Sequence, residues 1–286
     1  MKPLFAALAT VLTLVCAAPV RLASAQVAVV PGEKELLAAF KESFDSSDPD
    51  ARATAVTTLG DGSRGLPDKG GGKRVAQALV KGLEDQELEV CAAALFQLRD
   101  GRDVDAVIGA LDAFLREQYR QLERRVESSD DAARNHVDRA TVLFENGCHV
   151  LANYRDDRAA ATLVDFLGGL KADRKKNDLG SRLVGALATS ALELGTLAAA
   201  ESAVAQTMTF SGAAQAAGAR KLHEALAAFG NRTGMTPPEW SEAYTEHWHA
   251  WLEANRNQLP KKLGRLTTPP TSEPSQPLNG LPGKNG

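Results

Sequence analysis

A short pattern is repeated along this chain: an acidic turn followed by an apolar stretch with helical spacing. It covers Asp48–Leu59 and occurs again over Asp85–Leu98. The string Leu98–Leu111, which continues the second copy, returns as Tyr154–Leu167. A unit of this length cannot bury its own apolar face, so copies of it stack and share one core. The repetition predicts an all-α chain built as a right-handed α-solenoid of roughly five helical hairpins, a class of protein that usually binds and rarely catalyses.

The composition also favours helices over sheets. Only 5% of the residues are aromatic, whereas alanine and leucine are abundant. Helices pack closely through such side chains, while strands favour β-branched and aromatic ones. A helical fold without a sheet is therefore expected.

The apolar spacing predicts a series of hairpins, each with an outer and an inner helix. The expected helices cover 33–44, 51–59, 74–83, 87–98, 103–126, 132–151, 159–170, 179–194, 197–208 and 213–229. Expected ends of the inner helices are Leu59, Leu98, Tyr154, Leu194 and Phe229, in steps of 39, 56, 40 and 35 residues. The long step contains an extended hairpin over 104–153, which we expect to project beyond its neighbours at the Glu117–Arg134 end.

A glycine-rich stretch, residues 60–73, interrupts the repeats. A phosphate-binding loop is the more specific functional interpretation of this stretch. However, Gly72-Lys73 is followed by Arg74 rather than Ser or Thr, and no strand is expected before it. A flexible connector between hairpins fits the stretch better.

The N-terminal residues 1–25 have the layout of a secretory signal peptide. Lys2 precedes an apolar run, and Ala23–Ala25 offers a cleavage site. A retained membrane anchor and a lipoprotein signal at Cys16 are the alternatives. The prediction is an exported protein, periplasmic or secreted, that begins with an extended lead-in over 26–33.

Without the two positive charges of Lys2 and Arg21, the net charge changes from −3 to about −5. A mildly acidic chain with no basic block is a poor candidate for binding nucleic acid or anionic lipid. We therefore expect a protein or peptide partner and no transmembrane segment after cleavage.

The C-terminal part differs from the repeats in composition. The repeat domain is expected over 34–230, followed by a capping helix over 237–258 that holds all three tryptophans. Residues 267–286 are rich in Pro, Ser, Thr and Gly and predict a disordered tail.

The acidic turn with an Ala- and Leu-rich inner helix resembles HEAT-type repeats, relatives of armadillo repeats, and the tryptophan segment is similar to that of some exported bacterial HEAT-like proteins. The second copy carries the resemblance best, through Asp85, Glu87, Val90, Ala94 and Leu98. The resemblance implies a basic residue in each inner helix that pairs with the acidic turn of the neighbouring repeat. Arg52 occupies that position in the first copy, and Cys91 replaces it in the second, which predicts irregular stacking there.

Four arginines are the best candidates for contact with a partner: Arg99, Arg102, Arg155 and Arg158. They occupy equivalent places in two repeats, so they are expected to line up as a basic ridge on one edge. The plainer interpretation is that they are solvated turn residues that neutralise helix ends.

Trp248 and Trp251 are a second candidate for partner contact, because tryptophan is enriched at binding hot spots. Capping of the last repeat is the alternative role for them. His247 and His249 flank Trp248, but residues two apart on a helix face nearly opposite sides and cannot share one metal ion. No metal or cofactor site is predicted.

Cys91 and Cys148 are the cysteines outside the signal segment. Export would allow a disulfide, but both lie in apolar helical stretches, where a free cysteine behaves as a small buried side chain.

These features predict a non-catalytic exported scaffold or adaptor. The alternatives are a helical-repeat enzyme or enzyme subunit with a site near the long hairpin, and a structural spacer in an envelope.

Overall fold

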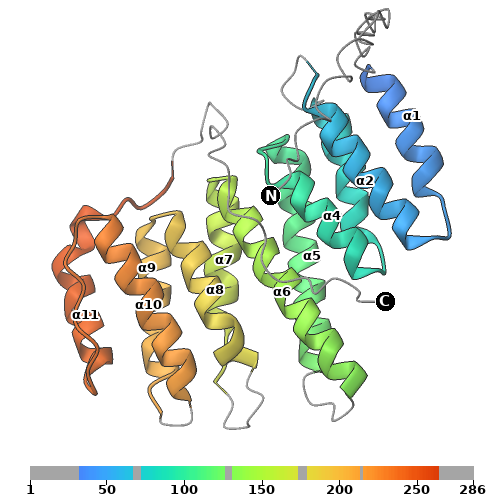
Figure 1. Ribbon diagram of the computed structural model, residues 1–286. Coiled ribbons are helices and arrows are strands. Elements are labelled where there is room, and N and C mark those ends of the chain that lie inside the picture. The colour runs from blue at the N-terminus through green and yellow to red at the C-terminus, as the bar shows by residue number, and fades with distance from the viewer. Residues whose placement is uncertain (1–31, 67–71, 126–130, 173–178, 213–214, 264–286) are drawn as a thin grey trace, which may run out of the picture. The chain divides into compact units, whose positions relative to one another are not determined.

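The computed structural model describes residues 32–66, 72–125, 131–172, 179–212 and 215–263. The prediction of an all-α fold is confirmed, since these residues form helices joined by turns and contain no strand (Figure 1). All of them belong to one unit, Pro31–Gly286. The expected signal peptide, lead-in and tail fall largely or wholly outside the described residues.

The helices follow one another with short connections. Their bounds are α1 Glu33–Phe44, α2 Pro49–Ser63, α3 Gly72–Val80, η1 Lys81–Glu84, α4 Leu88–Leu98, α5 Val104–Arg125, α6 Asp131–Asn153, α7 Asp157–Gly169, α8 Leu179–Glu193, α9 Leu197–Thr209, α10 Ala216–Arg232, α11 Tyr244–Asn255 and η3 Arg256–Gln258.

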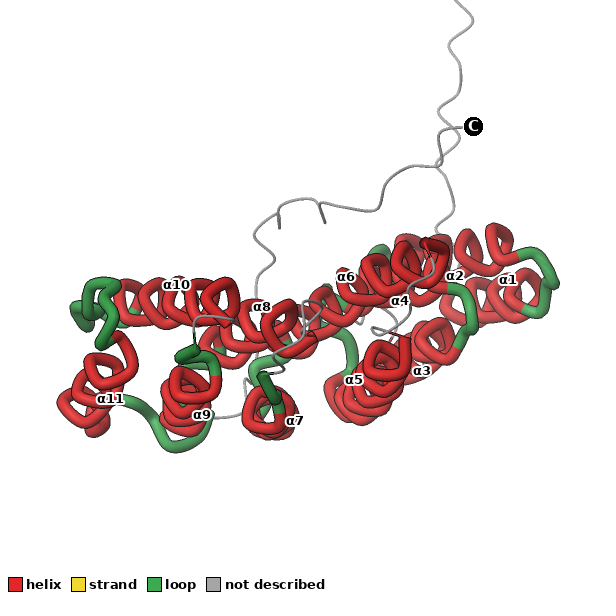
Figure 2. The backbone as a smooth tube through the Cα atoms, turned by 90° about the horizontal axis from the view of Figure 1, so that it is seen from below, coloured by secondary structure: helices red, strands yellow, loops and turns green. Residues whose placement is uncertain are grey.

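The helices lie in two rows. In one row α2, α4, α6, α8 and α10 contact each other in that order, and in the other α3, α5, α7, α9 and α11 do so (Figure 2). α1 lies beyond α2 and packs mainly against it. The long hairpin of α5 and α6 has 22 and 23 residues, and its joined ends reach beyond α4 in Figure 1.

Acidic turns cap helices in both rows: Asp48 begins α2 of the inner row and Asp156 begins α7 of the outer row. The Asp48 carboxylate accepts a hydrogen bond of 3.1 Å from the Asp50 amide, and Pro49 is the first helical residue of α2. The Asp156 carboxylate accepts a hydrogen bond of 2.9 Å from the Arg158 amide at the start of α7. These bonds satisfy amide groups that the first turn of a helix leaves without a partner, so the acidic residues have a structural role.

The glycine-rich stretch is shorter than predicted, because α2 continues through Ser63. Gly60 is buried, and a Cβ atom there would lie 2.2 Å from Oε1 of Gln97 in α4. Glycine at this position thus lets α2 and α4 approach closely. The prediction of a connector over 60–73 is wrong for its first four residues and for its last two, Gly72 and Lys73, which begin α3; residues 67–71 lie outside the described part.

The last helix also begins later than predicted. Residues 237–243 are not helical, and α11 begins at Tyr244. After α11 the chain turns back along the array (Figure 1). The Leu197 amide at the start of α9 donates a hydrogen bond of 2.8 Å to the Pro260 carbonyl. The Leu263 amide donates one of 2.7 Å to the Asp157 carboxylate at the start of α7. This returning segment ties the C-terminal end to α9 and also to α7, whose Asp157 lies 106 residues before Leu263.

Among the helices that the structure describes, none combines the length and the apolar character needed to cross a membrane.

Candidate partner-binding groove

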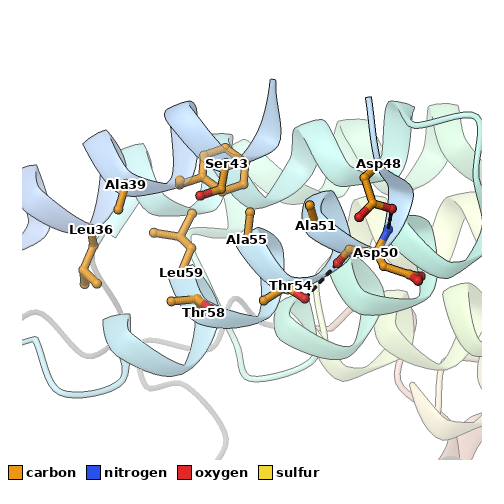
Figure 3. A pocket seen from close by; sticks show the side chains of 11 residues that line it. Leu36, Ala39, Ser43, Asp48, Asp50, Ala51, Thr54, Ala55, Thr58 and Leu59 are labelled. Carbon is orange, nitrogen blue, oxygen red and sulfur yellow. Dashed lines mark hydrogen bonds between the residues drawn. The ribbon is translucent and has the colours of Figure 1, made fainter. Parts of the chain in front are cut away.

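A groove of about 450 Å³ lies between α1 and α2, the first two helices that the structure describes (Figure 3). Its apolar lining comes from Leu36, Ala39 and Phe40 of α1 and from Ala51, Ala55 and Leu59 of α2. Its polar lining consists of Ser43, Asp48, Asp50, Thr54 and Thr58. The groove therefore combines an apolar strip with acidic and hydroxyl groups.

The groove exists because small side chains stand where the two helices face outward. Leu36 and Phe40 are each 6% exposed and belong to the core, whereas Ala39 of α1 and Thr58 of α2 are exposed. Alanine at 39, 51 and 55 leaves space that larger residues fill elsewhere in the fold. The result is an apolar floor that solvent reaches from the open end.

The acidic groups of the groove stand at the start of α2. Asp48 and Asp50 are both exposed. Thr54 donates its hydroxyl hydrogen over 2.8 Å to the Asp50 carbonyl, one helical turn earlier (Figure 3). That part of the groove therefore presents negative charge next to apolar surface.

An ion pair joins α2 to the turn before α4. Arg52 contacts Asp85 through two hydrogen bonds, Nε to Oδ2 at 2.7 Å and Nη2 to Oδ1 at 2.9 Å. The guanidinium lowers the pKa of the Asp85 carboxylate, chiefly through these hydrogen bonds. The pairing that the HEAT resemblance implies for Arg52 is thus present in the structure.

Cys91 takes the place of the arginine in the second copy, and its buried Sγ lies 3.3 Å from the Asp85 carbonyl oxygen. Cys148 is buried as well, and both thiols are free. Burial raises the pKa of Cys91 to about 12 and that of Cys148 well above its usual value. Both cysteines have the environment of small core residues, not of reactive thiols.

The four arginines do not form one continuous surface ridge. Arg102 is only 5% exposed, and its guanidinium donates to the Gly60 and Gln97 carbonyls and to the Ser63 hydroxyl. Arg102 therefore ties the C-terminal end of α2 to α4, and its expected position on a ridge is wrong.

The other three arginines lie nearer the surface. Arg99 stacks on the Phe96 ring at 3.8 Å and is only partly exposed, whereas Arg155 is exposed. Arg158 pairs with Asp156 at 2.9 Å and with Asp105 at 2.8 Å. Contact of these three with a partner stays a prediction.

The structure separates the three tryptophans. Trp248 is fully buried, and its indole N–H donates a hydrogen bond of 3.1 Å to Nδ1 of His223. Trp251 is 7% exposed, and its indole N–H donates one of 2.9 Å to the Thr236 carbonyl. Both indoles are packed inside the fold, and capping, the alternative role, stays a prediction. Trp240, by contrast, is 44% exposed and stacks on Tyr244 at 4.9 Å.

The histidines next to Trp248 are exposed, and His247 Nδ1 lies 3.1 Å from the Ser241 hydroxyl. In the described segments no group of three His, Cys, Asp or Glu side chains is placed to hold a metal ion.

One polar cluster joins the long hairpin to the next repeat. His149 of α6 places Nδ1 3.2 Å from the Ser190 hydroxyl and 3.9 Å from the Glu193 carboxylate. The Glu193 carboxylate raises the pKa of His149. Because one ring nitrogen faces both groups, the cluster lacks the triad arrangement, in which acid and nucleophile contact opposite nitrogens.

The groove was not predicted from the sequence. The available signal was the small side chains Ala39, Ala51 and Ala55 in the first two helices. No family model, no curated protein and no solved structure matches this chain.

Proposed function

We propose that this chain is an exported scaffold or adaptor that binds a protein partner in the groove between α1 and α2. The main supporting observation is the groove itself. Its apolar floor is open at one end of a helix row, and exposed acidic groups lie beside it. Binding sites commonly combine an apolar lining with a few placed polar groups.

The proposal includes a HEAT-like architecture, a right-handed α-solenoid of about five hairpins. It is supported by the order of contacts within each helix row and by the Arg52–Asp85 pair between the first two repeats. In such arrays each unit contacts its neighbours, and the end units have one face without a neighbour. The groove is on such a face.

The export signal over 1–25 and a periplasmic or secreted location remain part of the proposal and rest on the sequence. Mass spectrometry of the mature N-terminus from the exported fraction tests them. We expect the chain to begin at Gln26. A full-length chain retained in the cytoplasm would contradict this part without affecting the groove.

Two other functions compete with this proposal. An enzyme near the long hairpin would use the cluster at His149, in which Ser190 and Glu193 both face the same ring nitrogen. A purely structural spacer would leave the groove empty. One measurement separates both alternatives from the proposal: whether a partner protein occupies the groove.

Photo-crosslinking with matched neighbours tests the function. A photoreactive amino acid is placed at Ala39 or Thr58, which line the groove, and separately at Ala38 or Thr57, which are exposed on the same helices outside its lining. We expect one protein adduct from Ala39 and Thr58 in the native exported fraction. Equal adducts from all four positions, or none from the groove pair, would overturn the proposal.

A further inference from the structure

Three turns in this chain share one local geometry. Asp48, Asp85 and Asp156 each accept a hydrogen bond at Oδ1 from the backbone amide two residues later, over 3.1, 3.0 and 2.9 Å. In each case the carboxylate is fixed by its own backbone at the start of a helix or just before it. The remaining lone pairs of the carboxylate can accept hydrogen bonds from other groups.

Two of these carboxylates are also paired with a guanidinium. Asp85 receives Arg52 from the preceding repeat through two hydrogen bonds. Asp156 receives Arg158 through Nε to Oδ1 at 2.9 Å and Nη2 to Oδ2 at 3.2 Å. A fork of two hydrogen bonds is the arrangement that arginine and a carboxylate form best.

Asp48 differs from both. Within the described residues no arginine or lysine side chain donates a hydrogen bond to it. Arg52 attracts Asp48 only through space, because its guanidinium is bound to Asp85 and to the carbonyls of Ser46 and Ser47. Asp48 is exposed and lines the groove between α1 and α2. The first carboxylate of the series therefore lacks the cation that the second takes from its preceding helix.

We propose that the groove takes an amphipathic α-helix of the partner, whose arginine pairs with Asp48 as Arg52 pairs with Asp85. The inference rests on the proposed function and names the chemistry of its partner. The helix would lie over the groove between α1 and α2, with apolar side chains on Leu36, Phe40 and Ala55 and its arginine beside the start of α2.

The surroundings of the groove support this occupant. Ala39 is exposed and Ala51 is partly exposed, so the backbone of a helix can approach closely there, and a helix in a groove presents anchors at i, i+3, i+4 and i+7. Asp48 and Asp50 repel acidic segments and anionic surfaces and attract a cation. Arginine fits better than lysine, because the fixed carboxylate accepts two parallel hydrogen bonds.

Selection from a displayed library of randomised peptides tests the occupant. The bait is the chain without residues 1–25, and the counter-selection uses Ala39→Trp, which fills the groove at an exposed position. A matched Ala38→Trp variant must keep binding. We expect groove-dependent peptides with a helical apolar spacing and one arginine.

Asp48→Asn then tests the ion pair, because asparagine keeps the acceptor for the Asp50 amide and loses the charge. We expect the selected peptide to bind Asp48→Asn about tenfold more weakly, and a peptide with glutamine for the arginine to bind wild type and Asp48→Asn alike. The control Glu42→Gln, an exposed acid of α1 outside the groove lining, is expected to bind as wild type does.

Other outcomes overturn the inference in distinguishable ways. Groove-dependent peptides without arginine, or unchanged binding to Asp48→Asn, remove the ion pair and leave the proposed function standing. Enrichment of extended, proline-rich peptides removes the helix. Self-association of the wild type that Ala39→Trp abolishes, seen by sedimentation, replaces the partner with a second copy of the chain. No groove-dependent peptide at all removes this occupant, while the crosslinking experiment decides separately on the function.

Discussion

The two ends of the helix rows are finished in opposite ways. At the C-terminal end α11 covers the array with Trp248 and Trp251, and both indole N–H groups find acceptors inside the protein. At the N-terminal end α1 covers α2 only in part, and alanines leave a groove beside Asp48. A terminal unit of a stacked array needs a cover for its outer face. The difference supports the proposal that a partner binds at the N-terminal end of the rows, while α11 covers the C-terminal end in the described residues.

The largest expected effect is at the closed end. Trp248→Ala removes a fully buried indole and should lower the free energy of unfolding by about 3–5 kcal/mol, measured by urea denaturation. Trp240→Ala, at a side chain that is 44% exposed, should cost clearly less. Equal losses for the two variants would show that α11 does not close the array as described.

The next effect is inside the array, where Arg102 joins α2 to α4. Arg102→Met leaves the Gly60 carbonyl and the Ser63 hydroxyl without their buried donor and should cost about 2 kcal/mol in the same denaturation experiment. Arg155→Gln, at an exposed member of the expected ridge, should change stability by less than about 0.5 kcal/mol. A loss at Arg155 as large as at Arg102 would contradict their different burial.

The third effect compares the paired and the unpaired turn. Asp85→Asn loses the ion pair with Arg52 and should destabilise the chain more than Asp48→Asn, which keeps its cap and has no guanidinium to lose. The folded chain holds the pKa of Asp85 below its ordinary value, so the stability from this pair is present above about pH 3.8 and is lost as the pH falls below it.

The measurement is the difference in unfolding free energy between wild type and Asp85→Asn from pH 7 down to pH 3. A difference that stays constant, or that grows with acidity, would contradict the assignment.

The smallest effect on stability is at the open end. Ala39→Leu partly fills the groove from an exposed position and should shift the unfolding free energy by less than about 1 kcal/mol, in the stabilising direction. Its binding of the groove-selected peptide should nevertheless be lost. A stability change without an effect on binding would separate the groove from recognition.

Local patterns predicted most of the helices. The interval 33–44 matches α1 at both ends, and Glu87 is the N-cap of α4, because capping groups and apolar spacing act within a few residues. The start of α11 was missed, since Trp240 packs on Tyr244 and His223 instead of continuing a helix. The start of α11 therefore depends on the contact between Trp240 and His223 of α10, which is distant in sequence.

The candidate site was harder to predict for the same reason. Arg99 and Arg102 look alike in sequence, yet Gly101 has a positive φ of 71° and turns the chain back so that Arg102 reaches the end of α2. The groove likewise depends on how α1 crosses α2, and its alanines look in sequence like ordinary helix formers.

The central claim is that the partner binds at the open end and not at the closed one. Photo-crosslinking from Ala39 and from Glu242, an exposed residue just before α11, compares the two ends in one exported fraction. The account predicts a protein adduct from Ala39 and none from Glu242. An adduct from Glu242 with none from Ala39 would contradict it.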